Sequence, residues 1–186
     1  MGKLLERAAL AIFAVVLVAA FGALLLFKLA ENRVSARMKP PLLMRAPEPA
    51  SDLVYRTMDG QEQHLSATRG KVVFLNLWGT WCIPCLAEMP TVERLYEHYK
   101  GDPQVQFLIV SRLDSPKRVE GYARHNHFSL PFYVTRDQDI PQAMQFYQYP
   151  ATFVLAKDGT IVSKHFGAAD WSDGSVVKFI DRLRAE

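Results

Sequence analysis

The 186 residues of this chain suffice for one folded domain plus an appendage. About half of them, 49%, are hydrophobic and 22% are charged, which is ordinary for a globular protein. The net charge of +3 comes without a basic run or a ladder of basic and aromatic residues, so we expect no nucleic-acid partner. Two cysteines are too few for the framework of a small disulfide-rich secreted protein.

The first feature along the chain is an apolar segment at residues 8–27, which reads AALAIFAVVLVAAFGALLLF and contains no charge, amide or hydroxyl. A helix of about 20 residues spans about 30 Å, the hydrocarbon thickness of a bilayer. A core helix would carry a polar stripe, which is absent. A cleaved signal peptide has a shorter apolar core, and here the run continues past the signal-like exit Ala20-Phe21-Gly22. We therefore predict an uncleaved anchor, residues 1–29, that contacts lipid through residues 8–27.

The side of the membrane does not follow from charge. Two basic residues precede the apolar segment, whereas four follow it: Lys28, Arg33, Arg37 and Lys39. This count favours a cytoplasmic location for the remaining chain, although large domains cross the membrane regardless of such counts. We therefore infer the side of the membrane on which the domain lies from the chemistry of the domain.

A proline-rich stretch comes next. Residues 30–51 include four prolines between positions 40 and 49, which favours an extended, semi-rigid linker without regular secondary structure. We therefore place the folded domain at residues 52–186.

The domain alternates apolar runs of strand length with segments of helical periodicity. This order predicts an α/β fold with a mixed central sheet and helices on its faces. In chain order the predicted elements are a hairpin of residues 52–57 and 61–65, a buried strand at 71–78, a helix from about 86 to 99, a strand at 105–110, a helix at 116–126, a strand at 131–135, a short helix at 140–147, a hairpin of residues 152–156 and 160–166, and a last helix over Val176, Val177, Ile180 and Leu183.

Both cysteines, Cys82 and Cys85, lie where the strand that ends at Trp78 gives way to a helix. The amino terminus of a helix presents unpaired amide donors and a positive dipole end, which stabilise a thiolate. One turn separates the two residues, so a disulfide can form between them. Cys82, nearer the open end, is predicted to be the nucleophile, and Cys85 to resolve the mixed disulfide.

Two other uses of a CxxC pair fit less well. A zinc site needs two further ligands, and the sequence has no third cysteine and only His125 and His127 as a close histidine pair. We expect no metal and no other cofactor. A purely structural disulfide between these positions would close too small a loop to stabilise the fold much. A CxxC pair close to a βαβ pattern is typical of redox activity.

Residues 74–90, FLNLWGTWCIPCLAEMP, resemble the thioredoxin superfamily, and within it the membrane-anchored TlpA/ResA-like thiol–disulfide oxidoreductases. The resemblance extends over about residues 52–171, plus the anchor. It implies a thioredoxin-like fold with an amino-terminal hairpin. It also implies an extracytoplasmic domain that supplies electrons to disulfides, for example during cytochrome c maturation.

The resemblance also assigns prolines. Pro90 matches the proline that kinks the active-site helix, and Pro150 matches the cis-proline that faces the dithiol. From the residues alone, a cis bond and a trans proline that opens an edge strand were equally compatible with Pro150; the resemblance implies the cis bond. It would direct the Tyr149 amide at a bound substrate strand, and Trp81 would offer a substrate-docking platform.

The sequence departs from ordinary thioredoxins at two positions. Their buried aspartate, six residues before the first cysteine, is here Asn76, which cannot take a proton. Glu88, one helical turn past Cys85, is predicted to replace it, with a pKa raised by burial and a role in relaying the proton of Cys85. The alternative is a glutamate that only favours the helix dipole. Ile83, between the cysteines, is the second departure, and its effect on potential is not predicted.

We therefore expect an enzyme, a membrane-tethered protein disulfide reductase of the cytoplasmic (inner) membrane, single-pass, with its domain in the periplasm or cell exterior. Its expected partners are a membrane-embedded thiol electron donor and disulfide-bearing proteins such as apocytochrome c. Two alternatives remain open. One is an oxidase or isomerase, distinguished by reduction potential. The other is a metallochaperone or binding module with the thioredoxin fold. A peroxidase is disfavoured, because such enzymes carry threonine where this chain has Gly79.

Overall fold

The computed structural model describes residues 6–7, 10, 12–23, 25, 38–43, 47–145 and 148–186. Residues 38–186 form one compact unit, and residues 1–37 form another. In the second of these, residues 12–23 are helical. Among the described residues, no helix has both the length and the hydropathy needed to span a bilayer. Residues 1–5, 8, 9, 11, 24 and 26–29 of the predicted anchor, and residues 30–37 and 44–46 of the predicted linker, lie outside the described residues.

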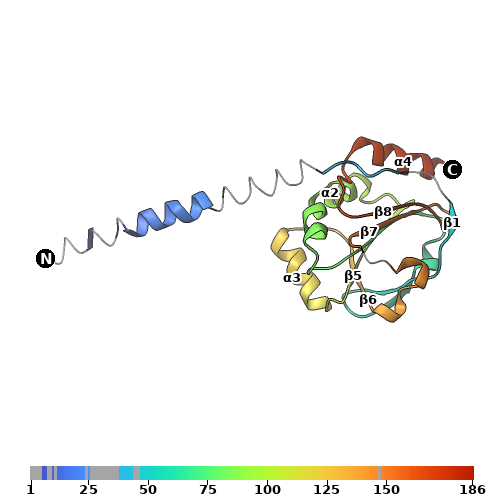
Figure 1. The fold of residues 1–186 in the computed structure, drawn as a ribbon, viewed down its shortest axis with the longest axis horizontal. Coiled ribbons are helices and arrows are strands. Elements are labelled where there is room, and N and C mark those ends of the chain that lie inside the picture. Colours follow the sequence, from blue (N-terminus) through green and yellow to red (C-terminus); the bar gives the residue numbers. More distant parts are fainter. Residues whose placement is uncertain are drawn as a thin grey trace. The chain divides into compact units, whose positions relative to one another are not determined.

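The compact unit is built on an eight-stranded mixed sheet in the order β1-β8-β7-β4-β5-β6-β2-β3 (Figure 1). Strands β4, β5 and β6 run parallel, and the other neighbouring pairs are antiparallel. The strands are β1 (Glu48–Pro49), β2 (Val54–Arg56), β3 (Glu62–His64), β4 (Val72–Trp78), β5 (Val105–Arg112), β6 (Phe132–Thr135), β7 (Ala151–Leu155) and β8 (Thr160–Phe166).

Strand β4 lies at the centre of this sheet, and all seven of its residues are buried. Because side chains alternate along a strand, Phe74 and Trp78 enter the cluster packed by the α-helices, whereas Leu75 and Leu77 enter the cluster on the opposite face. Asn76 has the parity of Phe74 and Trp78, so it lies on the helix-covered face.

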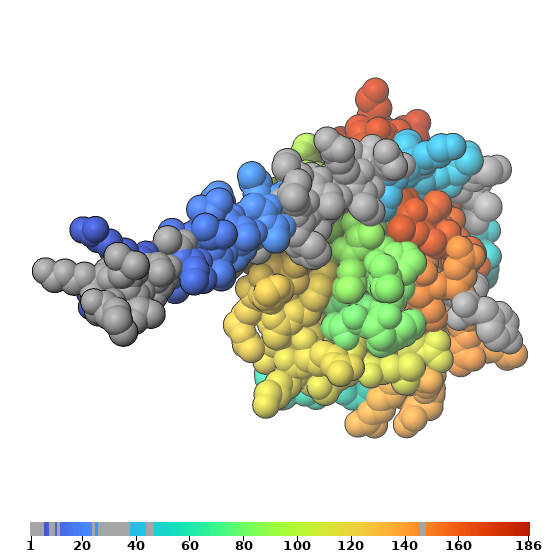
Figure 2. Space-filling model, turned by 60° about the vertical axis from the view of Figure 1, so that its left-hand side comes forward, coloured from blue at the N-terminus to red at the C-terminus, as the bar shows by residue number. Residues whose placement is uncertain are grey.

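Three α-helices supply one side of the core: α2 (Ile83–Tyr99), α3 (Pro116–Asn126) and α4 (Gly174–Ala185). The opposite face is packed in part by residues of the 3-10 turns η1 (Leu65–Thr68) and η3 (Gln142–Met144); a further turn, η2, covers Asp137–Asp139. The space-filling view in Figure 2 shows one side of the molecule with α2 and α3 next to each other on its surface.

The predicted thioredoxin-like α/β fold with a mixed sheet is confirmed. Both hairpins, the buried strand at β4 and the helix that starts after Ser115 form where the sequence predicts them. In the last helix the buried face includes Phe179, whereas Val177 is only partly buried.

The prediction of a short helix at residues 140–147 is wrong in the described part of that range. Only Gln142–Met144 form a single 3-10 turn, and Ile140 has extended backbone angles. The reason is Pro141, which disfavours helical backbone in the residue before it. Residues 146 and 147 lie outside the described residues.

The predicted absence of regular structure in the proline-rich stretch is also wrong at its end. Glu48 and Pro49 form β1, which pairs with β8 at the edge of the sheet, where a proline without an amide hydrogen is tolerated. Earlier in the same stretch, the carbonyl of Lys39 accepts a hydrogen bond of 2.9 Å from the amide of Asp170. Part of this stretch is thus attached to the compact unit.

Candidate active site

The two cysteines lie at the carboxyl end of β4 and the amino terminus of α2, where they form a disulfide with a Cα–Cα distance of 5.2 Å. Cys82 is the N-cap of α2 and has extended backbone angles, φ −97° and ψ 99°. Cys85 lies in the first turn and is fully buried, whereas Cys82 keeps 5% of its surface exposed. The order of exposure agrees with an attacking Cys82 and a resolving Cys85.

The helix terminus already places a donor against the outer sulfur. The amide of Cys85 donates to Cys82 Sγ at 3.3 Å. In the disulfide this sulfur is neutral, and it stands in for the thiolate that would form after reduction. A thiolate at that position would keep the amide bond and face the positive end of the helix dipole, which favours its ionisation. Proline is tolerated in this first turn, so Pro84 does not disturb the arrangement.

Outside the disulfide lies an aromatic platform made of the exposed Trp81 and the half-buried Tyr149. The indole of Trp81 is 47% exposed, and its Nε1 donates to the carbonyl of Arg112 at 3.1 Å. The Trp81 and Tyr149 rings meet edge to face, with centroids 5.6 Å apart. Gly79 makes room for this arrangement, because a Cβ at position 79 would collide with the Trp81 ring.

Arg112, at the end of β5, connects the platform to the sheet. Its guanidinium donates to the Tyr149 hydroxyl at 2.8 Å and forms an ion pair with Asp137 at 2.6 Å. The Tyr149–Pro150 peptide bond is cis, and the carbonyl of Pro150 accepts from the amide of Gly167 at 2.8 Å. The predicted docking residue Trp81 and the predicted substrate-binding residue Tyr149 are therefore in contact beside the cysteines; their role in binding stays a prediction.

The loop that carries Trp81 is held by a carboxylate. Asp114 accepts from the amide and the hydroxyl of Thr80, both at 2.7 Å, and from the Ser111 hydroxyl at 2.6 Å. Leu113, immediately before it, has a positive φ of 63°, which is uncommon for a residue with a side chain. These contacts attach the segment before Cys82 to the end of β5.

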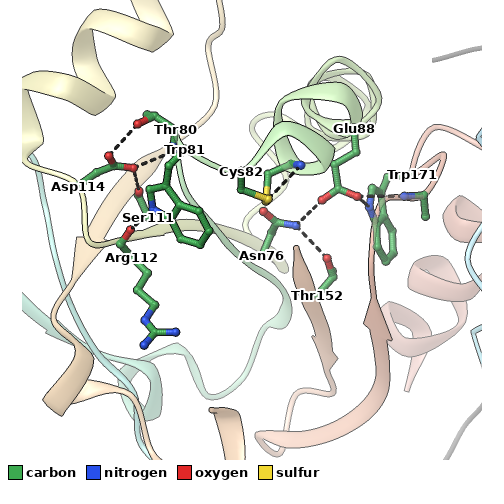
Figure 3. Close-up of a disulfide and its surroundings, with 12 residues drawn as sticks. Asn76, Thr80, Trp81, Cys82, Glu88, Ser111, Arg112, Asp114, Thr152 and Trp171 are labelled. Carbon is green, nitrogen blue, oxygen red and sulfur yellow. Dashed lines mark hydrogen bonds between the residues drawn. A yellow bond between two sulfur atoms is a disulfide. The ribbon is translucent and has the colours of Figure 1, made fainter. Parts of the chain in front are cut away.

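On the inner side of the disulfide, Glu88 is fully buried and accepts three hydrogen bonds. Asn76 Nδ2 donates to Oε1 at 2.8 Å, while the amide of Ala169 and Nε1 of Trp171 donate to Oε2 at 3.0 and 2.8 Å. Figure 3 shows this carboxylate between Asn76 and Trp171, beneath α2. Burial nevertheless raises the pKa of Glu88 to about 7, against the lowering effect of its three donors.

Among the described hydrogen bonds of Glu88, none is made to a cysteine. Asn76 is the partner of Glu88 that could connect it to the cysteines. Its Nδ2 also donates to Thr152 Oγ1 at 2.8 Å, and its Oδ1 has no hydrogen-bond partner. The sequence analysis noted Asn76 only as a missing base and assigned no role to Trp171. The only available signal for Trp171 was its place in the stretch GAADW, because contacts over more than 80 positions are not visible in a sequence.

The described residues include no group of three or more His, Cys, Asp or Glu side chains that could hold a metal ion. His64, for example, forms a pair with Asp52 at 2.8 Å.

Comparison with known proteins identifies the family of this chain. The Redoxin family model matches residues 44–179. The chain is 38% identical over 112 residues to the thiol-disulfide oxidoreductase ResA of Geobacillus kaustophilus, which covers 60% of this chain and 64% of that protein. It is 31% identical over 144 residues to ResA of Halalkalibacterium halodurans, with 77% and 80% covered.

A solved structure shows the same fold. The thioredoxin-family thiol:disulfide interchange protein of Chlorobium tepidum TLS superposes with a TM-score of 0.59, covering 75% of this chain and 97% of that one at 18% identity. The residues matched by the Redoxin model contain the whole site described above, and the predicted resemblance of the folded domain to ResA-like thiol–disulfide oxidoreductases is confirmed. The chain therefore belongs to the Redoxin family, among the thioredoxin-like relatives of the thiol–disulfide oxidoreductase ResA.

Proposed function

We propose that this protein is a membrane-tethered thiol–disulfide oxidoreductase that reduces disulfides of exported proteins, for example during cytochrome c maturation. The single observation that carries the chemistry is the Cys82–Cys85 disulfide at the amino terminus of α2, with an amide aimed at the outer sulfur. A pair in this position exchanges electrons by forming and breaking one disulfide.

The reaction starts from the reduced pair. The Cys82 thiolate attacks one sulfur of the substrate disulfide, and the other substrate sulfur leaves as a thiolate that takes up a proton. Cys85 then loses its thiol proton and attacks Cys82 Sγ. The bond between Cys82 and the substrate breaks, and the second substrate sulfur leaves. Two electrons have passed to the substrate, and the protein holds the disulfide seen in the structure.

The exposed platform supports a protein substrate. Trp81 and Tyr149 present aromatic surface next to Cys82, and aromatic side chains give large contact areas at little entropic cost. The Tyr149–Pro150 bond is cis, and the family resemblance implies that the Tyr149 amide then faces a bound substrate strand. An extended segment on either side of a substrate cysteine would lie across these groups.

The buried side supports control of the proton. Glu88 has a pKa near 7, so it exchanges a proton at neutral pH and is suited to accept the proton that Cys85 must lose. Its contact with Asn76 brings it within one side chain of the cysteines (Figure 3).

The tether rests on residues 8–27, which carry no charge over a length that matches a bilayer. An anchor would concentrate the domain near a membrane-embedded thiol donor that restores the reduced pair. We place the domain in the periplasm or cell exterior, because a cytosolic dithiol reductase needs no tether. The resemblance to TlpA/ResA-like proteins supports the same side.

The test is capture in cells with the full chain. In Cys85→Ala the mixed disulfide on Cys82 cannot be resolved, so the substrate stays attached and can be identified by mass spectrometry. We expect exported proteins with paired cysteines, apocytochrome c among them. Capture of cytosolic proteins alone would overturn both the location and the substrate class.

The direction of electron flow is tested separately. Equilibration with a reference dithiol gives the reduction potential of the pair. A reductase needs a low potential, whereas a value near that of the strong oxidant DsbA, about −120 mV, would contradict the proposal.

A further inference from the structure

The buried carboxamide of Asn76 has one polar atom, Oδ1, without a hydrogen-bond partner. Asn76 is fully buried on β4, and its Oδ1 is among the few buried side-chain atoms of the described residues without a hydrogen bond. A buried acceptor left unpaired costs about 1–3 kcal/mol, so a donor that appears in another state of the protein would stabilise that state.

The position of Oδ1 follows from the two bonds on the other end of the carboxamide. Nδ2 donates to Glu88 on α2 and to Thr152 on β7, each at 2.8 Å, which uses both of its hydrogens and fixes the orientation of the group. In Figure 3 the nitrogen of Asn76 points to Glu88 and Thr152, and the oxygen lies on the side of Cys82 and its sulfur.

The inner cysteine is the group that can use this acceptor. Cys85 is fully buried and packs in the cluster that contains Phe74 and Trp78, the two residues that flank Asn76 on the same face of β4. In the disulfide Cys85 has no hydrogen to donate. When a dithiol reduces the bond, two electrons and two protons enter; the dithiol becomes a disulfide, and a proton held by Cys85 makes it a weak donor. That thiol is buried, as the sulfur is in the disulfide.

We propose that Asn76 is a positioning residue for the resolving thiol: its Oδ1 accepts the Sγ–H of Cys85 in the reduced protein, while its Nδ2 holds Glu88. The inference rests on the proposed function, because it concerns the reduced state of the same pair. It makes the carboxamide a bridge with one end on the proton donor and the other on its acceptor.

A consequence for the redox equilibrium follows from the sign of this interaction. The Sγ–H···Oδ1 bond exists only in the reduced protein, and in the disulfide Oδ1 stays unpaired. Asn76 therefore favours the dithiol over the disulfide. Replacement by leucine, which has similar volume and no acceptor, should shift the equilibrium toward the disulfide by about fivefold, the equivalent of one ordinary hydrogen bond.

Two matched variants separate this effect from others. Trp171→Phe also removes one donor from Glu88 but leaves Asn76 intact, so it reports any influence that acts through the carboxylate. Thr152→Val removes a partner of Nδ2 but leaves Oδ1. We measure the fraction of disulfide in the full-length protein in detergent, equilibrated with a dithiol at known ratios. Asn76→Leu should shift the equilibrium about fivefold, and the two controls less than twofold. A shift no larger than that of Trp171→Phe would overturn the proposal.

A second measurement does not depend on a substitution at position 76. In Cys82→Ala, Cys85 is the only thiol, and its S–H stretching band in the infrared reports hydrogen bonding. We expect a band at lower frequency than that of an unbonded thiol, and a return to the unbonded frequency in the double variant with Asn76→Leu. An unbonded frequency in Cys82→Ala alone contradicts the proposal. If the wild-type pair failed to exchange with a dithiol at all, the proposed function would fall instead.

Discussion

The two sides of the disulfide differ in their residues: the outer side carries accessible aromatic side chains, and the inner side carries buried polar side chains. The outer side has Trp81, nearly half exposed, and Tyr149, joined through a guanidinium to an ion pair on the surface. The inner side has Asn76 and Glu88, both fully buried. Contacts with a protein substrate need accessible aromatic area, whereas control of a proton needs a site without water. The difference indicates that recognition and proton handling are assigned to opposite sides of one covalent bond.

The largest effect is expected at the bond itself. Cys82→Ala removes the nucleophile on which both sides act, so reduction of a protein disulfide should fall to the uncatalysed rate. Insulin reduction measures it. Cys85→Ala is the matched control, since it should still form the mixed disulfide but not release it. If Cys82→Ala formed the mixed disulfide while Cys85→Ala did not, the assigned roles would be reversed.

On the inner side, the ionisation of Glu88 should make the free energy of unfolding depend on pH. The native pKa of Glu88, about 7, lies above its ordinary value of 4.5, so the native state binds more protons in this window. Stability therefore falls as pH rises from 4.5 to 7, by about 3 kcal/mol from this group. Urea unfolding of wild type and Glu88→Gln across this range should show the fall only in the wild type.

Another titrating group close to Trp171 is His165, whose ring centroid lies 5.6 Å from that of Trp171. Burial lowers the pKa of His165, so its contribution rises with pH and opposes that of Glu88. It is present in both proteins, and the difference between them isolates Glu88. Identical slopes for the two proteins would show that the native carboxyl ionises normally.

A substitution on the outer side should slow the capture of a protein substrate and leave the free energy of unfolding nearly unchanged. Trp81→Ala removes exposed aromatic surface, so the rate of mixed-disulfide formation with a protein substrate should fall about tenfold. The free energy of unfolding should change by less than about 1 kcal/mol. Trp171→Phe is the contrasting variant, because it changes a buried ring and should cost about 1–3 kcal/mol of stability. Equal loss of stability in both would remove the distinction between the sides.

The smallest effect is expected at Arg112. Its ion pair with Asp137 is partly exposed, and such pairs contribute about 0.2–1 kcal/mol. Arg112→Gln should release the Tyr149 hydroxyl and slow capture two- to threefold, an effect that salt reproduces in the wild type. Arg124→Gln, at a more exposed arginine on α3 that pairs with Glu120, is the control. A tenfold loss would mean that the guanidinium contacts the substrate directly.

The sequence predicted the elements that local pattern determines. The buried run at β4, the helix behind the CxxC pair and the turn at Asp59-Gly60 depend on neighbouring residues, and all three form as expected. The burial of Glu88 also followed from its place one turn past Cys85. The apolar periodicity of residues 140–147 predicted a helix that does not form over the described residues 140–145, where Pro141 interrupts it.

The remaining parts of the site depend on long-range contacts. Trp171 reaches Glu88 across 83 positions, and Asn76 reaches Thr152 across 76. No periodicity connects such residues, and an asparagine in a strand has many partners open to it. The strand β1 was missed for the same reason, since it pairs with β8, which is distant in the sequence.

The central claim is that the end of α2 makes Cys82 the reactive thiol, and its alkylation rate as a function of pH tests this most directly. In Cys85→Ala, the rate of reaction with iodoacetamide follows the fraction of thiolate on Cys82. We predict half-maximal reactivity well below the value of about 8.5 for a free cysteine, because one amide and the helix dipole face the sulfur. Half-maximal reactivity at or above the free-cysteine value would contradict the account.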